Sequence, residues 1–542
     1  MRAAATAERG ESPLSQIRSR AWCGWPSIGA RRIAEDGSNQ ASYNATMRRS
    51  AAAIAFLFAS TAAAFAQQGA ARRLANDRPP NLVVIFVDDM GYADIGPFGS
   101  KTPTPSIDRI AKEGMRFTDF HASSAVCSAS RAALMTGCSH ARVSVHGAYG
   151  PDATQGIAAS ETTLAEICKQ KGYATACFGK WHLGLHPKFL PLQHGFDEYF
   201  GLPYSNDMWP SHPDYANLPK DAAAKKKGYP TLPLIDGNEV VDPEVTAEDQ
   251  KELTRRYTDR AVDFIRHNMA KSFFLYVPHT MAHVPLFASK EFEGSTKKGI
   301  YADVVAEVDE SVRRILEALD QGGIANNTLV VFTSDNGPWL SYGDHAGSAG
   351  PLREGKGTSW EGGHRVPCVM RWPARIPAGT TCDQLAITYD LLPTFAATIG
   401  AKLPDHTIDG RDISKLMRGE KGATTPHEAF YCYYSGQLQA VRDQRWKLVL
   451  PHSYATLAGA SGGTGGSPAP YQRRKTELAL YDLANDIGET KDVAAKHPEI
   501  VERLSQWAER AREDLGDSIQ KRTGSGVRPA GKLNDGDAKL AW

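Results

Sequence analysis

One uninterrupted apolar run, from Asn81 through Leu-Val-Val-Ile-Phe to Val87, limits the possible folds of this 542-residue chain more than any other stretch. Its β-branched and aromatic residues are typical of a strand that is buried on both faces of a sheet. A strand of this kind is covered by helices on both sides. The run therefore predicts an α/β fold with this strand in its interior.

Helix and strand signals alternate along the chain after this run. Helices are expected over 106–113 and 162–170, and strands over 115–120, 173–178, 273–277 and 328–333. Apolar residues at helical spacing indicate two longer helices. The apolar face of the first helix consists of Leu253, Tyr257, Ala261, Phe264 and Ile265. The apolar face of the second helix consists of Val304, Val305, Val308, Val312, Ile315, Leu316 and Leu319. The alternation predicts βαβ units and a large, mostly parallel central sheet covered by helices.

The character of the sequence changes near Ala423. Four short strand candidates follow at hairpin spacing, at 430–434, 438–441, 445–450 and 478–483. The Gly- and Ser-rich stretch 459–467 is expected to be a flexible loop between two of them. A helix is expected over 498–515, and the tail after Arg522 is expected to be loose. We therefore predict an α/β domain over 81–422 and a C-terminal subdomain with a small antiparallel sheet over 423–542.

The N-terminal part contains an export pattern. Met47-Arg48-Arg49 precedes the apolar stretch 51–65, and Ala64-Phe-Ala66 supplies a small-x-small cleavage site. We expect a signal peptide over 47–66, after a leader over 1–46 and before a linker over 67–80, and hence a periplasmic or secreted protein. A membrane anchor is the weaker alternative, because the apolar run is short and dominated by Ala. The mature form is expected to have no stable membrane span.

Charge and cysteine content narrow the possible partners. The chain has 62 basic and 61 acidic side chains and a net charge of +1, which gives no support for a nucleic-acid partner.

Seven of its eight cysteines remain once Cys23 of the leader is set aside. An odd number in an exported chain predicts one special thiol, for which Cys127 is the candidate, and up to three disulfides among the others. Those others are Cys138, Cys168, Cys177, Cys368, Cys382 and Cys432.

Reactive side chains recur at or shortly after the ends of the expected strands. They are Asp88-Asp89, Lys180-Trp-His182, His279 with His283, and Asp335-Asn336. In open α/β sheets ligands bind at the carboxyl edge of the strands, so four loops are expected to converge on one crevice. Taken singly, each pattern also has an ordinary structural explanation: a turn or helix cap for the acidic residues, and a surface Lys with a packed His for the 180–182 pair.

The acidic residues of this set indicate a metal site. Asp88, Asp89 and Asp335 bring three carboxylates, and Asn336 adds a neutral oxygen. Three carboxylates in one pocket repel one another, so a divalent cation is expected between them. An all-oxygen ligand set suits Ca²⁺ or Mg²⁺ rather than Zn²⁺, and we prefer Ca²⁺.

Two further stretches carry groups that suit an anionic substrate. If Ser130 or Arg131 opens a helix, Cys127 lies just before its N-terminus, where the helix dipole favours negative charge. The alternative for Cys127 is a buried structural cysteine. Lys356 lies in a Gly-x4-Gly-Lys spacing like that of a phosphate-binding loop. The segment does not meet the requirements of such a loop, because Gly357 replaces the required Ser or Thr and no strand precedes Gly350.

Five separated motifs between Asn81 and about Leu483 resemble the sulfatase family of the alkaline phosphatase superfamily. They are Asp88-Asp89, the stretch Cys-x-Ala-Ser-Arg-x4-Thr-Gly from Cys127, Lys180-Trp-His182, Asp335-Asn336, and Gly-Lys-Gly-Thr-x-x-Glu-Gly-Gly from Gly355. The resemblance implies that Cys127 is oxidised to Cα-formylglycine by a maturase. The usual family motif has Pro at the place of Ala129, and the anaerobic radical maturase of the family is expected to accept Ala there.

The resemblance also implies roles for the individual residues. The metal ligands would be Asp88, Asp89, Asp335, Asn336 and the formylglycine at position 127. Arg131 and Lys180 would hold the formylglycine hydrate and the sulfate, His182 would act as base, and His283 and Lys356 would bind sulfate oxygens and assist the leaving group. One hydroxyl of the hydrate attacks sulfur, and the second then loses its proton to His182 so that sulfate leaves and the aldehyde returns. A serine lacks that second hydroxyl.

Within the family, the stretch from Phe200 to Asp207 resembles the arylsulfatase A branch, which acts on small aryl and sugar sulfates. Trp209, Trp339 and Trp360 are candidates for stacking on such a ring, although a Trp more often packs in a core. The sequence thus predicts hydrolysis of sulfate esters. Two alternatives stay open: a phosphonate or phosphate ester hydrolase of the same superfamily, and a sulfate-ester binding protein whose Cys127 is not matured.

Overall fold

The computed structural model describes residues 47–48, 78–212 and 218–541. The predicted leader, all but the first two residues of the predicted signal peptide, and most of the predicted linker therefore lie outside the described residues. Within the described residues, no helix is both long enough and apolar enough to span a bilayer.

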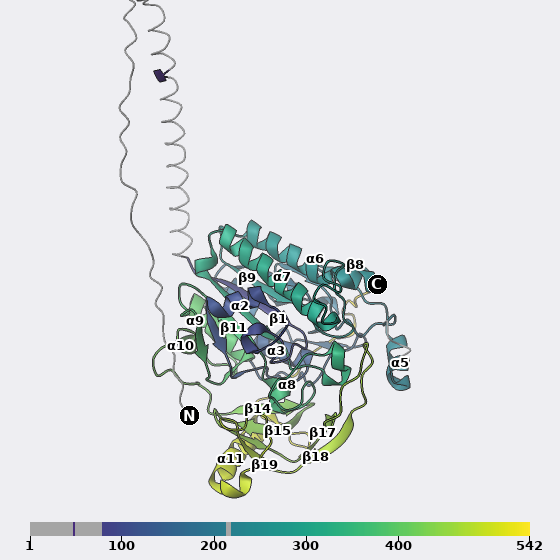
Figure 1. Ribbon diagram of the computed structural model, residues 1–542, viewed down its shortest axis with the longest axis vertical. Coiled ribbons are helices and arrows are strands. Elements are labelled where there is room, and N and C mark those ends of the chain that lie inside the picture. The colour runs from purple at the N-terminus through teal and green to yellow at the C-terminus, as the bar shows by residue number, and fades with distance from the viewer. Residues whose placement is uncertain (1–46, 49–77, 213–217, 542) are drawn as a thin grey trace, which may run out of the picture. The chain divides into compact units, whose positions relative to one another are not determined.

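A ten-stranded sheet forms the centre of the protein (Figure 1). In spatial order its strands are β12 (Thr380–Cys382), β2 (Met115–Phe117), β11 (Cys368–Arg371), β10 (Thr328–Ser334), β1 (Asn81–Val87), β9 (Phe273–Pro278), β5 (Ala174–Phe178), β6 (Glu198–Gly201), β7 (Leu234–Asp236) and β8 (Glu239–Asp242). The five strands from β10 to β6 are parallel. This mostly parallel sheet confirms the predicted fold class.

Strand β1 lies in the middle of this sheet because both of its faces are apolar. Leu82, Val84 and Phe86 belong to one core, and Val83 and Ile85 belong to the core on the other side. The first core is completed by α3 (Cys127–Thr136), α4 (Leu164–Lys169), α9 (Leu391–Ile399) and α10 (Ser414–Met417), and the second by α2 (Pro105–Lys112), α6 (Ala247–His267) and α7 (Ile300–Gln321). All side chains of β1 are buried, as the sequence predicts.

The register of the parallel strands brings their carboxyl ends to one edge. Val87 at the end of β1 lies opposite Ser334 at the end of β10, and Phe86 lies opposite Pro278 at the end of β9. The loops that follow these strands therefore begin side by side. This edge is where the polar residues expected at the strand ends are placed.

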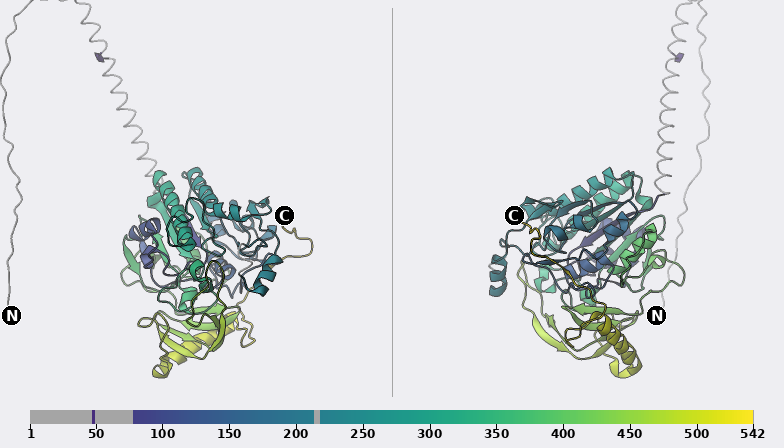
Figure 2. Two further views of the ribbon diagram at one scale, coloured as in Figure 1. Left: turned by 45° about the vertical axis from the view of Figure 1, so that its right-hand side comes forward. Right: turned by 180° about the vertical axis from the view of Figure 1, so that it is seen from behind.

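The C-terminal part forms a second, antiparallel sheet at one end of the protein (Figures 1 and 2). Its strands are β14 (Phe430–Tyr434), β15 (Gln437–Arg442), β16 (Trp446–Val449) and β19 (Ala479–Asp482), close to the four predicted strands, and α11 (Pro498–Leu515) covers it. A separate hairpin of β17 (His452–Thr456) and β18 (Gln472–Thr476) was not predicted. The Gly- and Ser-rich loop connects these two strands rather than two strands of the four-stranded sheet.

Three local predictions differ from the structure. The strand expected over 115–120 is divided into β2 and β3 (Phe120–His121), because β3 pairs with β13 (Ala386–Ile387) outside the central sheet. The helix expected to open at Ser130 or Arg131 begins at Cys127 itself. The C-terminal tail is not loose: β20 (Gly531–Lys532) pairs with β4 (Gln155–Gly156), and Arg528 binds Glu161 at 2.6 Å.

The predicted disulfides are absent from the described residues, in which all seven cysteines are free and buried. The geometry of the sheet explains why one possible pair, Cys368 and Cys382, forms no disulfide. Cys368 on β11 and Cys382 on β12 both lie opposite Phe117, on either side of β2. Two strand spacings separate them by about 9.5 Å, beyond the reach of a disulfide.

A buried ion network joins the C-terminal sheet to the α/β core. Arg442 at the end of β15 donates to Asp119 at 2.8 Å and to Glu361 at 2.9 Å. Lys447 of β16 lies 3.0 Å from Glu361 and 2.9 Å from Glu489. Glu361 is the first residue of the short helix α8 (Glu361–His364). Because these charges are almost fully buried, each needs its partner to remain ionised.

We expect the substitution Lys447→Met to lower the free energy of unfolding by about 3–5 kcal/mol, because it leaves the buried carboxylates of Glu361 and Glu489 without their shared cation. Urea unfolding followed by fluorescence measures the change. The matched control is Lys491→Met, since Lys491 is exposed; its effect is expected to stay within about 0.5 kcal/mol. Equal midpoints for the two variants would contradict the role of the network.

Candidate functional site

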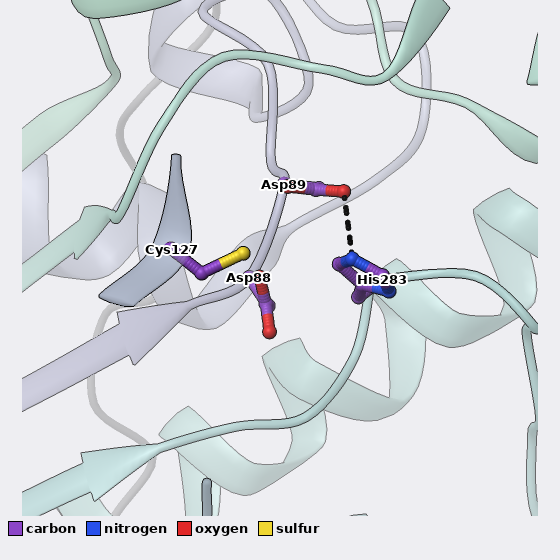
Figure 3. Close-up of side chains that lie close together, drawn as sticks. All are labelled: Asp88, Asp89, Cys127 and His283. Atoms are coloured by element: carbon purple, nitrogen blue, oxygen red, sulfur yellow. Dashed lines mark ion pairs between the residues drawn. The ribbon is translucent and has the colours of Figure 1, made fainter. Parts of the chain in front are cut away.

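The two aspartates after β1 lie at the centre of the site (Figure 3). Asp88 and Asp89 are buried, and Asp89 adopts a left-handed backbone conformation with φ of 55°. Its Oδ1 accepts a hydrogen bond from Nδ2 of Asn336 at 2.7 Å, and its backbone N–H donates to Oδ1 of Asp335 at 3.1 Å. The ends of β1 and β10 thus bring three carboxylates and one amide together, as expected from their places at the ends of strands.

Two buried cations compensate part of this negative charge. Arg131 on α3 donates to Oδ2 of Asp335 from Nη2 at 2.9 Å and from Nε at 3.2 Å, and its Nη2 lies 3.3 Å from Asp88. Lys180, which follows β5, donates to Oδ2 of Asp88 and to Oγ of Ser205. These contacts place Arg131 and Lys180 among the carboxylates, where the resemblance implied that they would hold an anionic substrate.

The pKa values of the carboxyl groups show that the compensation is incomplete. Burial alone would raise the pKa of Asp88, but Lys180 and Arg131 hold it well below its usual range. Burial and the adjacent Asp88 carboxylate raise the pKa of Asp335 to about 7. The positive charges of Lys180 and Arg131 thus stabilise one ionised carboxylate, that of Asp88, better than they stabilise the two carboxylates of Asp88 and Asp335 together. A further cation would favour the ionised form of both groups.

Two oxygen atoms of the site are free to bind such a cation. Oδ1 of Asp88 and Oδ1 of Asn336 are buried and have no hydrogen-bond partner among the described residues. A buried, unpartnered polar atom is costly unless a water or an ion satisfies it. With Asp89 and Asp335 alongside, these atoms form the all-oxygen set that Ca²⁺ and Mg²⁺ prefer. Ligand atoms of Asp88, Asp89, Cys127 and His283 lie within 4.8 Å of one another. The residues therefore fit a divalent cation.

Cys127 is the first residue of α3 and points toward the aspartates (Figure 3). The preceding Val126 provides no side-chain cap, so the first turn of the helix presents its positive end to the site. Burial raises the pKa of the Cys127 thiol to about 12, although Lys180 and Lys356 act in the opposite direction. An unmodified thiol at this position is therefore protonated and a weak nucleophile.

Lys356 and His283 form the opposite side of the site. Nζ of Lys356 donates to Oδ2 of Asp89 at 2.8 Å and to Nε2 of His283 at 2.9 Å. Burial opposes its charge, but the carboxylates of Asp89 and Asp88 keep the pKa of Lys356 well above its ordinary value. Nδ1 of His283 lies 2.6 Å from the carbonyl oxygen of Val284, which only accepts, so Nδ1 carries the proton and Nε2 accepts from Lys356.

His182 is buried with one ring nitrogen in use. Its Nε2 lies 2.9 Å from the carbonyl oxygen of Tyr149, and its Nδ1 has no partner among the described residues. Because a carbonyl only accepts, Nε2 carries the hydrogen and Nδ1 has a free lone pair. Burial and the nearby Lys180 keep the pKa of His182 well below its ordinary value, so the ring is neutral.

Sequence reasoning missed two residues that support the site. Ser205 binds Lys180, and the carbonyl of Tyr149 orients His182. Neither belongs to a recognisable motif, since a single Ser and a backbone carbonyl carry no sequence signal. His279 directly follows β9, as expected, but its Nε2 lies 3.1 Å from Oγ of Ser311 on α7.

The three candidate tryptophans have different environments. Trp209 is buried and packs against Phe287, and Trp360 is buried between Tyr454 and Tyr481, so neither is available to stack on a substrate. Trp339 is partly exposed. Its ring lies 4.5 Å from Nζ of Lys356 and 5.6 Å from the ring of His283. Of the three, Trp339 alone borders the site.

Comparisons with known proteins agree with this arrangement. The sulfatase family model matches residues 80–401, and the model for the C-terminal region of aryl-sulfatase matches residues 425–531. The chain is 34% identical to arylsulfatase G of Mus musculus, over 82% of this chain and 89% of that protein. It is 36% identical to arylsulfatase A of Homo sapiens, over 80% of this chain and 88% of that protein.

A solved structure shows the same fold. It is that of PsFucS1 sulfatase from Pseudoalteromonas sp., with a TM-score of 0.69 and 25% identity, covering 81% of this chain and 93% of that one.

We expect Lys180→Met to lower the free energy of unfolding of chelator-treated protein by about 3–5 kcal/mol, because it removes the nearest cation from the buried Asp88 carboxylate. Urea unfolding in EDTA measures the change. The control is Lys169→Met, since Lys169 forms a surface ion pair with Asp197; a loss of at most about 1 kcal/mol is expected. A Lys180 variant as stable as the control would show that Asp88 does not depend on this contact.

Proposed function

The chain belongs to the sulfatase family and is a sulfuric ester hydrolase of the arylsulfatase type; we propose that it acts through a formylglycine made from Cys127 and a bound divalent cation. The observation that carries the proposal is the position of Cys127. It is buried at the start of α3, beside the carboxylates of Asp88 and Asp89 and within electrostatic range of Lys180 and Lys356.

Four residues would hold the cation, for which we propose Ca²⁺. Asp88 and Asn336 would each contribute the oxygen that lacks a partner, and Asp89 and Asp335 would contribute carboxylate oxygens. When bound, the cation would neutralise these carboxylates and attract an oxygen of the sulfate group. Ca²⁺ is favoured over Mg²⁺ because the protein supplies several oxygen ligands, whereas Mg²⁺ usually retains much of its water.

The side chains around Cys127 would orient and activate the nucleophile. The formylglycine hydrate would supply one hydroxyl to attack sulfur and a second to release the sulfate. Arg131 and Lys180 flank the carboxylates next to it and supply fixed positive charge for the sulfate oxygens. The free Nδ1 of His182 would take up the proton that must leave the second hydroxyl, since its Nε2–H is held by the carbonyl of Tyr149.

Lys356 would stabilise the leaving group, and His283 would position Lys356. Lys356 is held protonated by Asp89, so it can donate a hydrogen bond to the ester oxygen on which negative charge develops. His283 accepts from Lys356 and keeps its ammonium group in place. Trp339 borders both residues and would contact an aromatic or sugar ring attached to that oxygen. The substrates we propose are therefore small aryl or sugar sulfates.

Maturation and location complete the proposal. A maturase that accepts Ala129 in place of Pro would convert Cys127, and the signal pattern over 47–66 would direct the chain to the periplasm or outside the cell. Conversion would have to occur before folding is complete, because Cys127 is 2% exposed in the folded protein.

We expect the wild type, produced in a host with a suitable maturase, to turn over nitrophenyl sulfate many times, and Cys127→Ser to release at most one equivalent of nitrophenol per enzyme. A serine offers one hydroxyl, so the sulfated side chain has no second hydroxyl with which to expel sulfate. Rapid-mixing absorbance measurements distinguish a single burst from steady turnover.

Peptide mass spectrometry of the wild type is the matched control. The peptide that contains residue 127 should carry an aldehyde, and treatment with a hydrazide should label it. A free thiol that iodoacetamide alkylates in the active wild type, or repeated turnover by Cys127→Ser, would contradict the proposal.

Removal of the cation gives an independent test. We expect EDTA-treated enzyme to lose activity and to recover it with Ca²⁺ more fully than with Mg²⁺, and Ca²⁺ to raise the melting temperature of the chelated protein by binding the folded state. Asn336→Ala should weaken the calcium-induced rise in melting temperature, whereas Asn485→Ala on the C-terminal surface should leave it unchanged. The metal proposal fails if Ca²⁺ shifts the melting temperature of none of these proteins.

A further inference from the structure

The outward face of the hairpin β17–β18 carries two uncovered positive charges, Arg473 and Lys475, and Arg474 between them is exposed on the other face. Arg473, Arg474 and Lys475 are consecutive and exposed on the edge strand β18. Arg473 lies opposite Ala455 and Lys475 lies opposite Ser453, both on β17. Directly opposed residues share one face of a hairpin, and these small partners leave the two cations open to solvent.

The three cations in this row have no acidic partner in the described part of the chain, unlike several other exposed arginines of the protein. Arg255, Arg313 and Arg445 each lie within 2.8 Å of an acidic side chain. Among the described residues, no ion pair or side-chain hydrogen bond involves Arg473, Arg474 or Lys475. In a chain with a net charge of only +1, three adjacent unpaired cations form a local concentration of positive charge.

A hollow of about 380 Å³ lies beside this row. Arg473 and Lys475 line it together with Gln437, His452, Ser453 and Glu477. Cationic, amide and hydroxyl groups can bind sulfate oxygens and sugar hydroxyls, and Glu477 contributes the carboxylate of this lining. Pro451 and Ile519 add apolar surface to this lining, so the recess is mixed, with positive charge from Arg473 and Lys475 on its wall.

The hairpin is connected directly to the rim of the catalytic site. The hydroxyl of Tyr471 accepts a hydrogen bond at 3.2 Å from the backbone N–H of Ser341, two residues after Trp339. At the other strand, Oγ1 of Thr456 donates to Glu354 at 2.7 Å, two residues before Lys356. From Tyr471, Arg473 and Lys475 lie about 7 Å and 13 Å further along the chain, given the rise of a strand.

We propose that the outward face of the β17–β18 hairpin is a second binding site, which holds sulfate groups of a polysulfated glycan chain while one of its sulfate esters occupies the catalytic site. The proposal rests on the proposed function and extends its substrate class from small sugar sulfates to sulfated sugars within a chain. A repeating polyanion fits this face better than a single small anion, since Arg473 and Lys475 follow one another at a spacing of about 7 Å along a strand that leads away from the catalytic rim.

Binding to immobilised dextran sulfate tests the proposal. The triple variant Arg473→Ala, Arg474→Ala, Lys475→Ala is compared with Lys402→Ala, Lys415→Ala, Lys421→Ala, which removes the same charge from exposed positions elsewhere. We expect the hairpin variant to bind about tenfold more weakly than the wild type and the control variant to change less than about twofold. Wild-type affinity should fall as salt is raised, and neutral dextran should not bind.

Hydrolysis of nitrophenyl sulfate separates this proposal from the proposed function. Both triple variants should keep the wild-type kcat/KM for that small ester, because the hairpin residues lie outside the catalytic machinery. Loss of turnover in the wild type itself would refute the proposed function. Equal affinity of the two triple variants for dextran sulfate would refute the second site. Binding of double-stranded DNA to the hairpin as tight as that of dextran sulfate would assign it to nucleic acid and would also overturn the proposal.

Discussion

The site depends on the compensation of buried carboxylates at the carboxyl edge of the central sheet. Asp88 and Asp335 are fully buried, and burial of an unpaired carboxylate is costly. Arg131 contacts both, and Lys180 contacts Asp88. These contacts tie the ends of β1, β5 and β10 to the first turns of α3. The same charges that keep the edge folded are therefore the charges that we propose to face the sulfate ester and the cation.

A second set of buried charges fixes the other half of the site. The segment that contains Lys356 belongs to the α/β part of the chain, but the C-terminal sheet holds it. The guanidinium of Arg353 lies 3.5 Å from the centre of the Trp360 ring and donates to the carbonyl of Glu489, and Glu361 is paired with Lys447. Contacts from the C-terminal part therefore help to hold the segment that carries Lys356.

Much of this arrangement could be predicted from the sequence, for reasons that differ between residues. The buried strand 81–87 was recognisable from its continuous apolar pattern, and parallel register then brought Asp88, Asp89 and Asp335 together. The start of α3 at Cys127 was not predicted, since no capping side chain marks it. The supports from Ser205 and the Tyr149 carbonyl depend on tertiary contacts alone. The hairpin β17–β18 was missed because its second strand, Gln-Arg-Arg-Lys-Thr, has no apolar alternation.

The missed strand β18 belongs to a hairpin that contacts the segment carrying Lys356. A strand of consecutive cations buries no apolar face, and so it contributes little to a core. It stays ordered because its partner β17 places Tyr454 and Thr456 inward, against Arg353 and Glu354. The contacts that position Lys356 therefore also hold the charged edge strand in place. A change in the C-terminal sheet should accordingly be felt both around Lys356 and along the cationic face, even though Asp88, Asp89 and Asp335 follow strands of the central sheet.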